Sequence, residues 1–199
     1  MHISTNSTPS MHPFLPPRGS DAIRVIQNGG LVLLPTANLW QVISDFRLTA
    51  TRQRHLSLCP PTATNRPELI FSDLDLLHKW IPRLHPKLDN LLMYHRRALT
   101  ILVDRPATIP IELSDSQGKV AVRLIQDSYC YRLSEDINAP LLATLAQPVG
   151  ANLPLSFGQL RSDLLRSVDY VVKRRQRDQI GPAPAVCIQL NELDEIEFL

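Results

Sequence analysis

The sequence lacks the features of a membrane protein, a secreted disulfide protein or a metal centre. No run reaches the roughly 18 consecutive apolar residues of a membrane-spanning helix, and the N-terminus has no basic start followed by an apolar stretch. The three cysteines, Cys59, Cys130 and Cys187, are widely spaced, with no C-x-x-C pair and no histidine at zinc-ligand spacing. We therefore expect a cytoplasmic protein with reduced thiols, no membrane association and no protein-bound metal.

Charge of one sign is also scarce, and so are the common catalytic motifs. The formal net charge is only +2, so composition alone does not imply a polyanionic partner. There is no nucleophile elbow, phosphate-binding loop or dinucleotide fingerprint, which argues against a conventional hydrolase or dehydrogenase. With 44% hydrophobic and 20% charged residues over 199 positions, the chain has the composition of one compact globular domain.

Proline, by contrast, is abundant, and its distribution separates a tail from a domain. The chain has 17 prolines, and four of them fall within residues 1–19 among serine, threonine and histidine. Such a segment buries too little apolar surface to order itself. We therefore predict a flexible N-terminal tail over 1–19 and a folded domain over 20–199.

Short apolar runs and capping residues predict the elements of that domain. Short apolar runs, several of them rich in β-branched residues, predict strands at 31–34, 69–71, 98–103, 120–124, 141–144, 170–172, 185–190 and 196–198. Capping serines and apolar periodicity predict helices that begin at Ser20 and Ser72, and further helices over about 87–94, 126–137 and 157–166. Strands alternating with helices indicate an α/β fold, with short connections favouring a mixed sheet.

Four segments resemble, in order, the motifs of one known family. Gly29-Gly30 leads through an apolar strand into Pro35-Thr36, as in G-G-x-V-x-x-P-T-[DE]-T-x-Y-G-L. Residues 98–103 resemble P-G-P-L-T-x-x-L, residues 120–123 resemble V-A-V-R-x-P, and residues 140–150 resemble P-L-x-A-T-S-A-N-x-S-G. Over about residues 20–199 the chain thus resembles the YrdC/YciO/YwlC-like family of threonylcarbamoyl-AMP synthases.

The resemblance implies both a fold and a reaction. The family's fold is a twisted mixed β-sheet with flanking helices around a basic concave cavity. Its enzymes are nucleotidyltransferases that convert threonine, bicarbonate and ATP to threonylcarbamoyl-adenylate for a tRNA adenosine modification. ATP would be a substrate accompanied by Mg²⁺, and no tightly bound cofactor is expected.

The same resemblance assigns candidate site residues. It implies substrate-binding roles for Thr36, Asn38, Arg123 and Thr144, and nucleotide-binding roles for Thr100 and Gly150. Arg123 is the most informative, because a guanidinium suits a carboxylate through its two-pronged geometry. The alternatives are plain: Arg123 could form an ordinary surface ion pair, the threonines could serve sheet propensity alone, and the glycine could serve a turn.

The chain departs from the motifs at chemically important positions. The family's acidic residue is Ala37, its K-x-R pair should fall near 58–61 where the chain reads Leu-Cys-Pro-Pro, and its serine and asparagine are Leu145 and Gln147. Two missing cations remove charge-assisted bonds worth on the order of 1.5 to 3 kcal/mol each. The sequence thus predicts impaired or altered catalysis, and it leaves open whether the chain is an enzyme.

Clustered basic residues suggest a second kind of ligand. Candidate RNA-binding residues are Arg96, Arg97, Lys173, Arg174, Arg175 and Arg177. Such blocks neutralise phosphates of tRNA or double-stranded RNA, although a solvated loop is the simpler explanation for a single run. Three hypotheses remain open: an active synthase, a non-catalytic module that binds double-stranded RNA or a nucleotide, and a partner-binding scaffold without a ligand.

Overall fold

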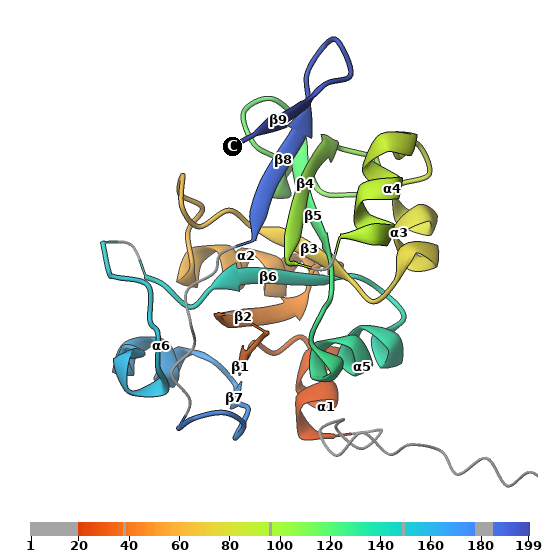
Figure 1. Ribbon diagram of the computed structural model, residues 1–199. Coiled ribbons are helices and arrows are strands. Elements are labelled where there is room, and N and C mark those ends of the chain that lie inside the picture. The colour runs from red at the N-terminus through yellow and green to blue at the C-terminus, as the bar shows by residue number, and fades with distance from the viewer. Residues whose placement is uncertain (1–19, 38, 96, 149, 178–184) are drawn as a thin grey trace, which may run out of the picture.

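The computed structural model describes residues 20–37, 39–95, 97–148, 150–177 and 185–199 (Figure 1). Within these ranges nine strands form one sheet in the order β7-β1-β2-β6-β3-β5-β4-β8-β9. The strands are β1 (Val32–Pro35), β2 (Trp40–Asp45), β3 (Glu68–Phe71), β4 (Leu99–Asp104), β5 (Lys119–Leu124), β6 (Leu141–Leu145), β7 (Tyr170–Val171), β8 (Val186–Leu190) and β9 (Ile196–Phe198). The tail predicted over 1–19 lies outside the described residues.

The sheet is mixed, as predicted. Strand β1 runs parallel to β7, β3 to β5, and β4 to β8, whereas the other neighbouring pairs are antiparallel. The C-terminal β8–β9 hairpin projects from one end of the molecule (Figure 1). Together with its flanking helices, this twisted sheet confirms the predicted fold class.

Six α-helices and two short 3-10 turns connect the described strands. They are α1 (Asp21–Gln27), α2 (Thr49–Leu58), α3 (Leu74–Trp80), α4 (Pro86–Tyr94), α5 (Ser128–Ile137), α6 (Ser162–Ser167), η1 (Ile111–Leu113) and η2 (Phe157–Gln159). The longest of these, α2 and α5, have 10 residues each, and no helix in the described ranges could cross a bilayer.

Local side-chain chemistry explains where several helices begin and end. Asp73 accepts a hydrogen bond from the backbone of Leu76 at 2.8 Å, and Asp127 caps α5 in the same way. Asn138, with φ of 51°, ends α5 in the left-handed conformation. Ser20 is the N-cap residue of α1, as predicted, although its side chain makes no cap hydrogen bond. The predicted cap at Ser72 is wrong, because α3 is capped by Asp73.

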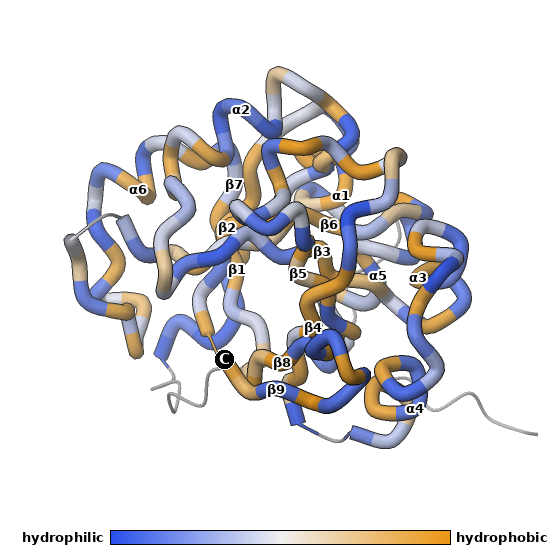
Figure 2. Tube along the Cα trace, turned by 90° about the horizontal axis from the view of Figure 1, so that it is seen from above, coloured by the Kyte–Doolittle hydropathy of each residue, from blue (hydrophilic) through white to orange (hydrophobic). Residues whose placement is uncertain are grey.

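Two elements were absent from the sequence-based prediction, and one predicted helix is divided. Strand β2 is buried along its whole length, although it carries the polar residues Gln41, Ser44 and Asp45. Helix α2 is mostly polar, and it also buries Arg52, so it lacks the apolar stripe that marks a surface helix (Figure 2). The helix predicted over 157–166 is wrong as a single element, because extended backbone at residues 160–161 separates η2 from α6.

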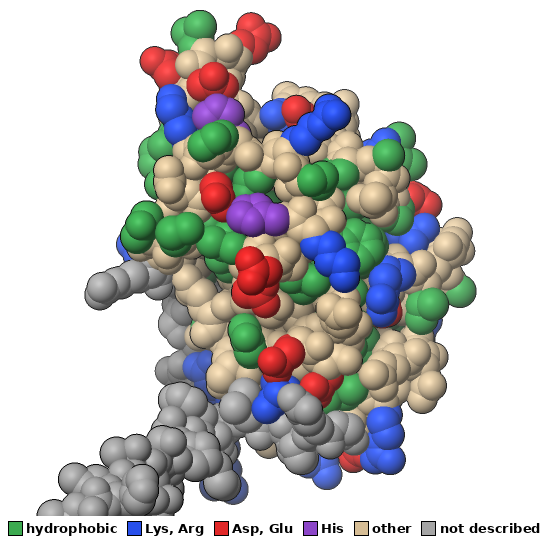
Figure 3. All heavy atoms as spheres, turned by 90° about the vertical axis from the view of Figure 1, so that its right-hand side faces the viewer, with side chains coloured by type: hydrophobic (Ala, Val, Ile, Leu, Met, Phe, Trp, Pro, Cys, Tyr) green, Lys and Arg blue, Asp and Glu red, His purple; other side chains and the backbone are tan. Residues whose placement is uncertain are grey.

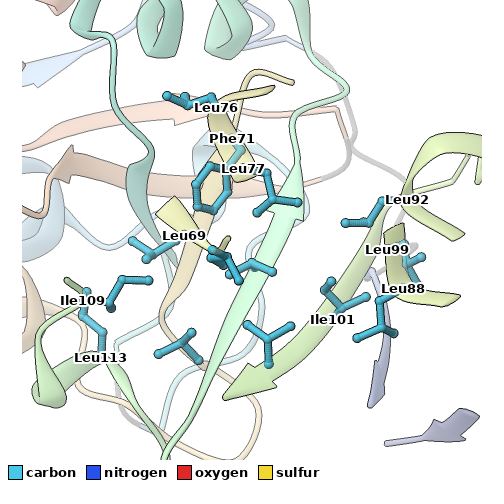
Figure 4. Close-up of a cluster of buried hydrophobic side chains, with 14 of the residues drawn as sticks. Leu69, Phe71, Leu76, Leu77, Leu88, Leu92, Leu99, Ile101, Ile109 and Leu113 are labelled. Carbon is cyan, nitrogen blue, oxygen red and sulfur yellow. The ribbon is translucent and has the colours of Figure 1, made fainter. Parts of the chain in front are cut away.

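Helices pack on both faces of the sheet. Helices α1 and α5 pack on one face against β1, β2 and β6, with Ile26 and Leu133 in the shared core. On the opposite face α3 and α4 pack through Leu77 and Leu88 against β3, β4 and β5 (Figure 4). Side chains alternate along a strand, so the central strands β3 and β6 contribute to both layers.

One part of the first face is not filled by an apolar cluster. Ile101, Val122 and Ile188 point into the core beneath α3 and α4, so their neighbours Thr100, Arg123 and Cys187 point the other way. None of the hydrophobic clusters among the described residues includes these three side chains. This part of the sheet borders a cavity instead.

Candidate ligand cavity

A cavity of about 190 Å³ lies on this face, where strands β2, β3, β4, β5, β6 and β8 run side by side. Leu39, Ala63, Leu145, Ala185 and Leu199 provide much of its apolar wall. Its polar lining comes mainly from Gln41, Arg66, Glu68, Thr100, Arg123 and Cys187. A concave site with an apolar wall and a few convergent polar groups is the usual form of a small-molecule site.

Arg123 lies at the centre of this polar lining. Its side chain is 9% exposed, and its Nη2 lies 2.9 Å from Oε2 of Glu68 and 3.2 Å from Oε1 of Gln41. Its buried Nε has no hydrogen-bond partner among the described residues. The guanidinium is thus held inside the molecule, and its ion pair with Glu68 is largely buried, unlike the surface ion pair of the simpler alternative.

Glu68 links three strands through its carboxylate. Its Oε2 contacts Arg123 on β5, and its Oε1 accepts a hydrogen bond of 2.6 Å from the hydroxyl of Thr100 on β4. Thr100 and Arg123 are direct cross-strand partners, and Glu68 is diagonal to Arg123 on the parallel neighbour β3. The sheet register therefore fixes the carboxylate and both of its partners.

A second guanidinium lies in the same cavity. Arg66, in the segment before β3, donates from Nη1 to Sγ of Cys187 at 3.4 Å. Burial raises the pKa of the Cys187 thiol, and the nearby Arg66 opposes this shift only partly, so the thiol is neutral near pH 7. Sequence reasoning missed Arg66, which supplies a cation shortly after the segment where the family's K-x-R pair was expected.

The other predicted substrate-binding residues are not all brought together. Thr36 and Arg123 both line a second, smaller cavity of about 20 Å³, where the Thr36 hydroxyl donates to the carbonyl of Leu39 at 2.8 Å. Thr144 points away from the main cavity, because its neighbour Leu145 lines that cavity and side chains alternate along β6. Asn38 lies outside the described residues.

Of the two predicted nucleotide-binding residues, only one lies at the cavity. Thr100 lines it through the hydroxyl that binds Glu68. Gly150 is exposed, has a φ of +75° and lines neither cavity, which suits the turn role proposed as its alternative.

Thr144 belongs to a buried polar network on the opposite side of the sheet. Its hydroxyl lies 2.8 Å from Nε2 of His55 on α2, and Nδ1 of His55 lies 2.6 Å from the hydroxyl of Ser44 on β2. Complete burial lowers the pKa of His55 to about 3, so the ring is neutral. This network joins α2 to the centre of the sheet.

Within the described ranges, no group of three histidine, cysteine or acidic side chains is arranged to hold a metal ion.

The basic residues predicted to bind RNA do not line the main cavity. Arg97, Lys173 and Arg177 are exposed, and Arg96 lies outside the described residues. Arg174 lies 3.7 Å from Asp127 and 4.7 Å above the ring of Tyr129.

Arg175 donates from Nη1 to the carbonyl of Thr36 at 2.8 Å. The run 173–177 thus has internal contacts beside the end of β1.

On the face shown in Figure 3, basic and acidic side chains are intermixed and do not form one uniformly basic surface.

Comparison with known proteins identifies the family. The model of the Sua5/YciO/YrdC family, described as "Telomere recombination", matches residues 24–192. No curated protein matches the chain significantly.

Solved structures share the fold at low sequence identity. The structure of E. coli YciO is similar with a TM-score of 0.76 and 16% identity, covering 89% of this chain and 85% of that protein. A double mutant of P. abyssi Sua5 has a TM-score of 0.75 and 18% identity, covering 86% of this chain and 52% of Sua5. The structure of P. abyssi Sua5 complexed with L-threonine has a TM-score of 0.71 and 18% identity, covering 85% of this chain and 49% of Sua5. The chain therefore spans about half the length of the Sua5 structures.

The family match covers most of the described domain, and the solved structures share its sheet and helices. Both agree with the motifs in the sequence. The chain belongs to the Sua5/YciO/YrdC family.

Proposed function

We propose that the main cavity binds a small zwitterionic amino acid of threonine's size, and that the chain is a threonylcarbamoyl-AMP synthase relative with weak or lost adenylation. The observation that carries this proposal is the meeting of two guanidiniums, Arg66 and Arg123, with one carboxylate, Glu68, in one cavity. An α-amino acid presents the complementary pair of charges.

The functional groups of threonine have chemical partners in this cavity. Its carboxylate suits a guanidinium, its ammonium suits Glu68, and its hydroxyl suits the amide of Gln41. Charge-assisted hydrogen bonds of this kind are worth about 1.5 to 3 kcal/mol each. The P. abyssi Sua5 structure with L-threonine supports the choice, because that relative has the same fold and binds this amino acid.

The size and charge of the cavity are less suited to ATP. Its volume of about 190 Å³ is below the roughly 300 to 1,000 Å³ typical of drug-sized ligand sites. A triphosphate would also meet the Glu68 carboxylate. The described residues offer no cluster that fits a protein-held Mg²⁺, so any Mg²⁺ would arrive with the nucleotide.

Calorimetric titration with L-threonine tests the binding step. We expect binding by the wild type and its loss in Arg66→Ala, which removes the guanidinium that is not paired with Glu68, whereas Arg97→Ala, an exposed arginine outside the cavity, should bind like the wild type. A pyrophosphate-release assay with threonine, bicarbonate and ATP tests the reaction, and we expect little or no turnover. If threonine does not bind, the proposed function is wrong; rapid turnover would instead show that adenylation survives.

RNA binding is a second candidate, favoured by the exposed cations Lys173 and Arg177 on a segment held by internal contacts. Phosphate contacts release counterions, so the affinity for duplex RNA should fall steeply with salt concentration. Replacing both residues with alanine should reduce that salt dependence. A salt-independent signal, or no binding at low salt, would exclude this function.

A further inference from the structure

We propose that Glu68 is the charge-selectivity residue of the cavity: it competes for Arg123 and thereby excludes phosphorylated, multiply anionic ligands. The inference deepens the proposed function, since it concerns the charge class that the same cavity accepts. It begins from the position of the carboxylate, whose Oε2 lies 2.9 Å from Nη2 of Arg123. This is the position that an oxygen of an anionic ligand would otherwise occupy.

The carboxylate is held in place and does not behave as a mobile surface group. Its other oxygen accepts the 2.6 Å hydrogen bond from Thr100, and its side chain is only 17% exposed. Exposed ion pairs are weakened by water and salt, but this pair lies between neighbouring strands in a fixed register. An incoming anion must therefore displace Glu68 from both partners or accept its repulsion.

The net charge of the cavity side chains determines which ligands can displace Glu68 or tolerate its repulsion. Among the side chains of the described lining residues, Arg66 and Arg123 are cationic and Glu68 is anionic, which leaves one positive side-chain charge in excess. A single carboxylate can be neutralised by Arg66, and an accompanying ammonium gains Glu68 as its partner. A phosphate group, which carries up to two negative charges, exceeds the available positive charge and has no ammonium to offset Glu68.

Replacing Glu68 with glutamine isolates the charge from the shape. Glu68→Gln keeps the length of the side chain and an oxygen that can accept from Thr100, but it removes the negative charge. We expect the affinity for inorganic phosphate to rise about tenfold or more, and that for L-threonine to fall about tenfold. Glu135→Gln, the same change at an exposed position on α5 outside the cavity, should alter neither affinity.

A second variant tests the same idea without changing any charge. Thr100→Val keeps the β-branched shape in β4 and removes the hydroxyl that holds Glu68. The freed carboxylate should compete less well for Arg123, so phosphate binding should rise, though less than in Glu68→Gln. Circular dichroism and thermal unfolding would confirm that each variant is folded.

The outcomes separate this inference from the proposed function. If wild-type protein binds threonine but neither variant gains affinity for phosphate, the role assigned to Glu68 is wrong and the proposed function stands. If wild-type protein does not bind threonine but Glu68→Gln gains phosphate binding, the proposed function fails and the role of Glu68 stands. No binding of any of these ligands by any variant overturns both.

Discussion

His55 on α2 and Thr144 on β6 lie 2.8 Å apart, from ring Nε2 to hydroxyl oxygen, in the buried interior behind the cavity. The same ring contacts Ser44 through its other nitrogen. Two hydrogen bonds therefore fix the imidazole between a polar helix and the middle of the sheet. This relationship helps to attach α2, which has no apolar stripe, and Arg52 adds a hydrogen bond of 2.8 Å to the carbonyl of Phe46.

Replacing His55 with alanine should destabilise the fold strongly. The change leaves a void and removes the partners of two buried hydroxyls, so we expect a loss of about 2 to 5 kcal/mol in the free energy of unfolding. Urea denaturation would measure it. His78→Ala, which removes a half-exposed histidine paired with Asp89, should cost less than about 1 kcal/mol. Equal losses in the two variants would contradict a structural role for the buried network.

Acid should weaken the protein through the same histidine. The pKa of His55 is lowered to about 3 in the folded state from 6.5, so the unfolded chain binds a proton that the folded chain does not between these values. Stability contributed by the neutral ring is fully present above pH 6.5 and falls as the pH decreases, by about 1.4 kcal/mol per pH unit. Denaturation at pH 7 and pH 5 should show this loss in wild-type protein. His55→Gln should lose less over the same interval, and an unchanged slope would refute the assignment.

Arg175 should contribute to stability through its contacts at the end of β1. Its backbone conformation also predicts different effects of alanine and glycine at this position. It donates to the carbonyl of Thr36, and it adopts a φ of 50°, which disfavours residues with a side chain. Arg175→Ala should cost about 1.5 to 3 kcal/mol, and Arg175→Gly about 1 kcal/mol less because glycine relieves the backbone. Lys173→Ala, nearby and exposed, should have little effect on thermal unfolding. Equal costs for the alanine and glycine variants would contradict the backbone argument.

Cys187 should report on occupancy of the cavity. It is partly exposed in the cavity wall, whereas Cys59 and Cys130 are buried, so iodoacetamide should label Cys187 first. Because its pKa is raised, labelling should be slow at pH 7 and should accelerate with rising pH as the thiolate forms. Saturating L-threonine should slow it further. Mass spectrometry would identify the labelled site, and labelling unaffected by threonine would place the ligand elsewhere.

The sequence predicted those elements whose local hydrophobic pattern matches their burial in the structure. Strands β4, β5 and β6 were predicted correctly because their residues form short apolar runs, which in β4 and β5 are rich in β-branched side chains. Arg123 was singled out because its strand carries a family motif, and the structure places it in a cavity. The absence of β2 and α2 from the prediction has one cause: both bury polar groups, such as Gln41 and His55, that hydrophobic periodicity treats as exposed.

The remaining parts of the site depend on long-range pairing. Glu68 and Arg66 become cavity residues only because β3 lies between β6 and β5, and no local pattern in the sequence specifies that order. The prediction of Thr144 as a cavity residue could have been avoided, because the alternation of side chains along a strand argues against it. Once Leu145 is placed toward the cavity, its neighbour on the same strand must face the other way.

The order of the strands has a consequence for how the site forms during synthesis. Lining residues are drawn from Leu39 to Leu199, and β8 reaches the cavity by pairing with β4. While β8 is still inside the ribosome, the nascent chain therefore cannot form the complete cavity, even if the other strands have already paired. Contacts of such large sequence separation cost loop-closure entropy, so we expect ligand binding only once β8 has paired with β4.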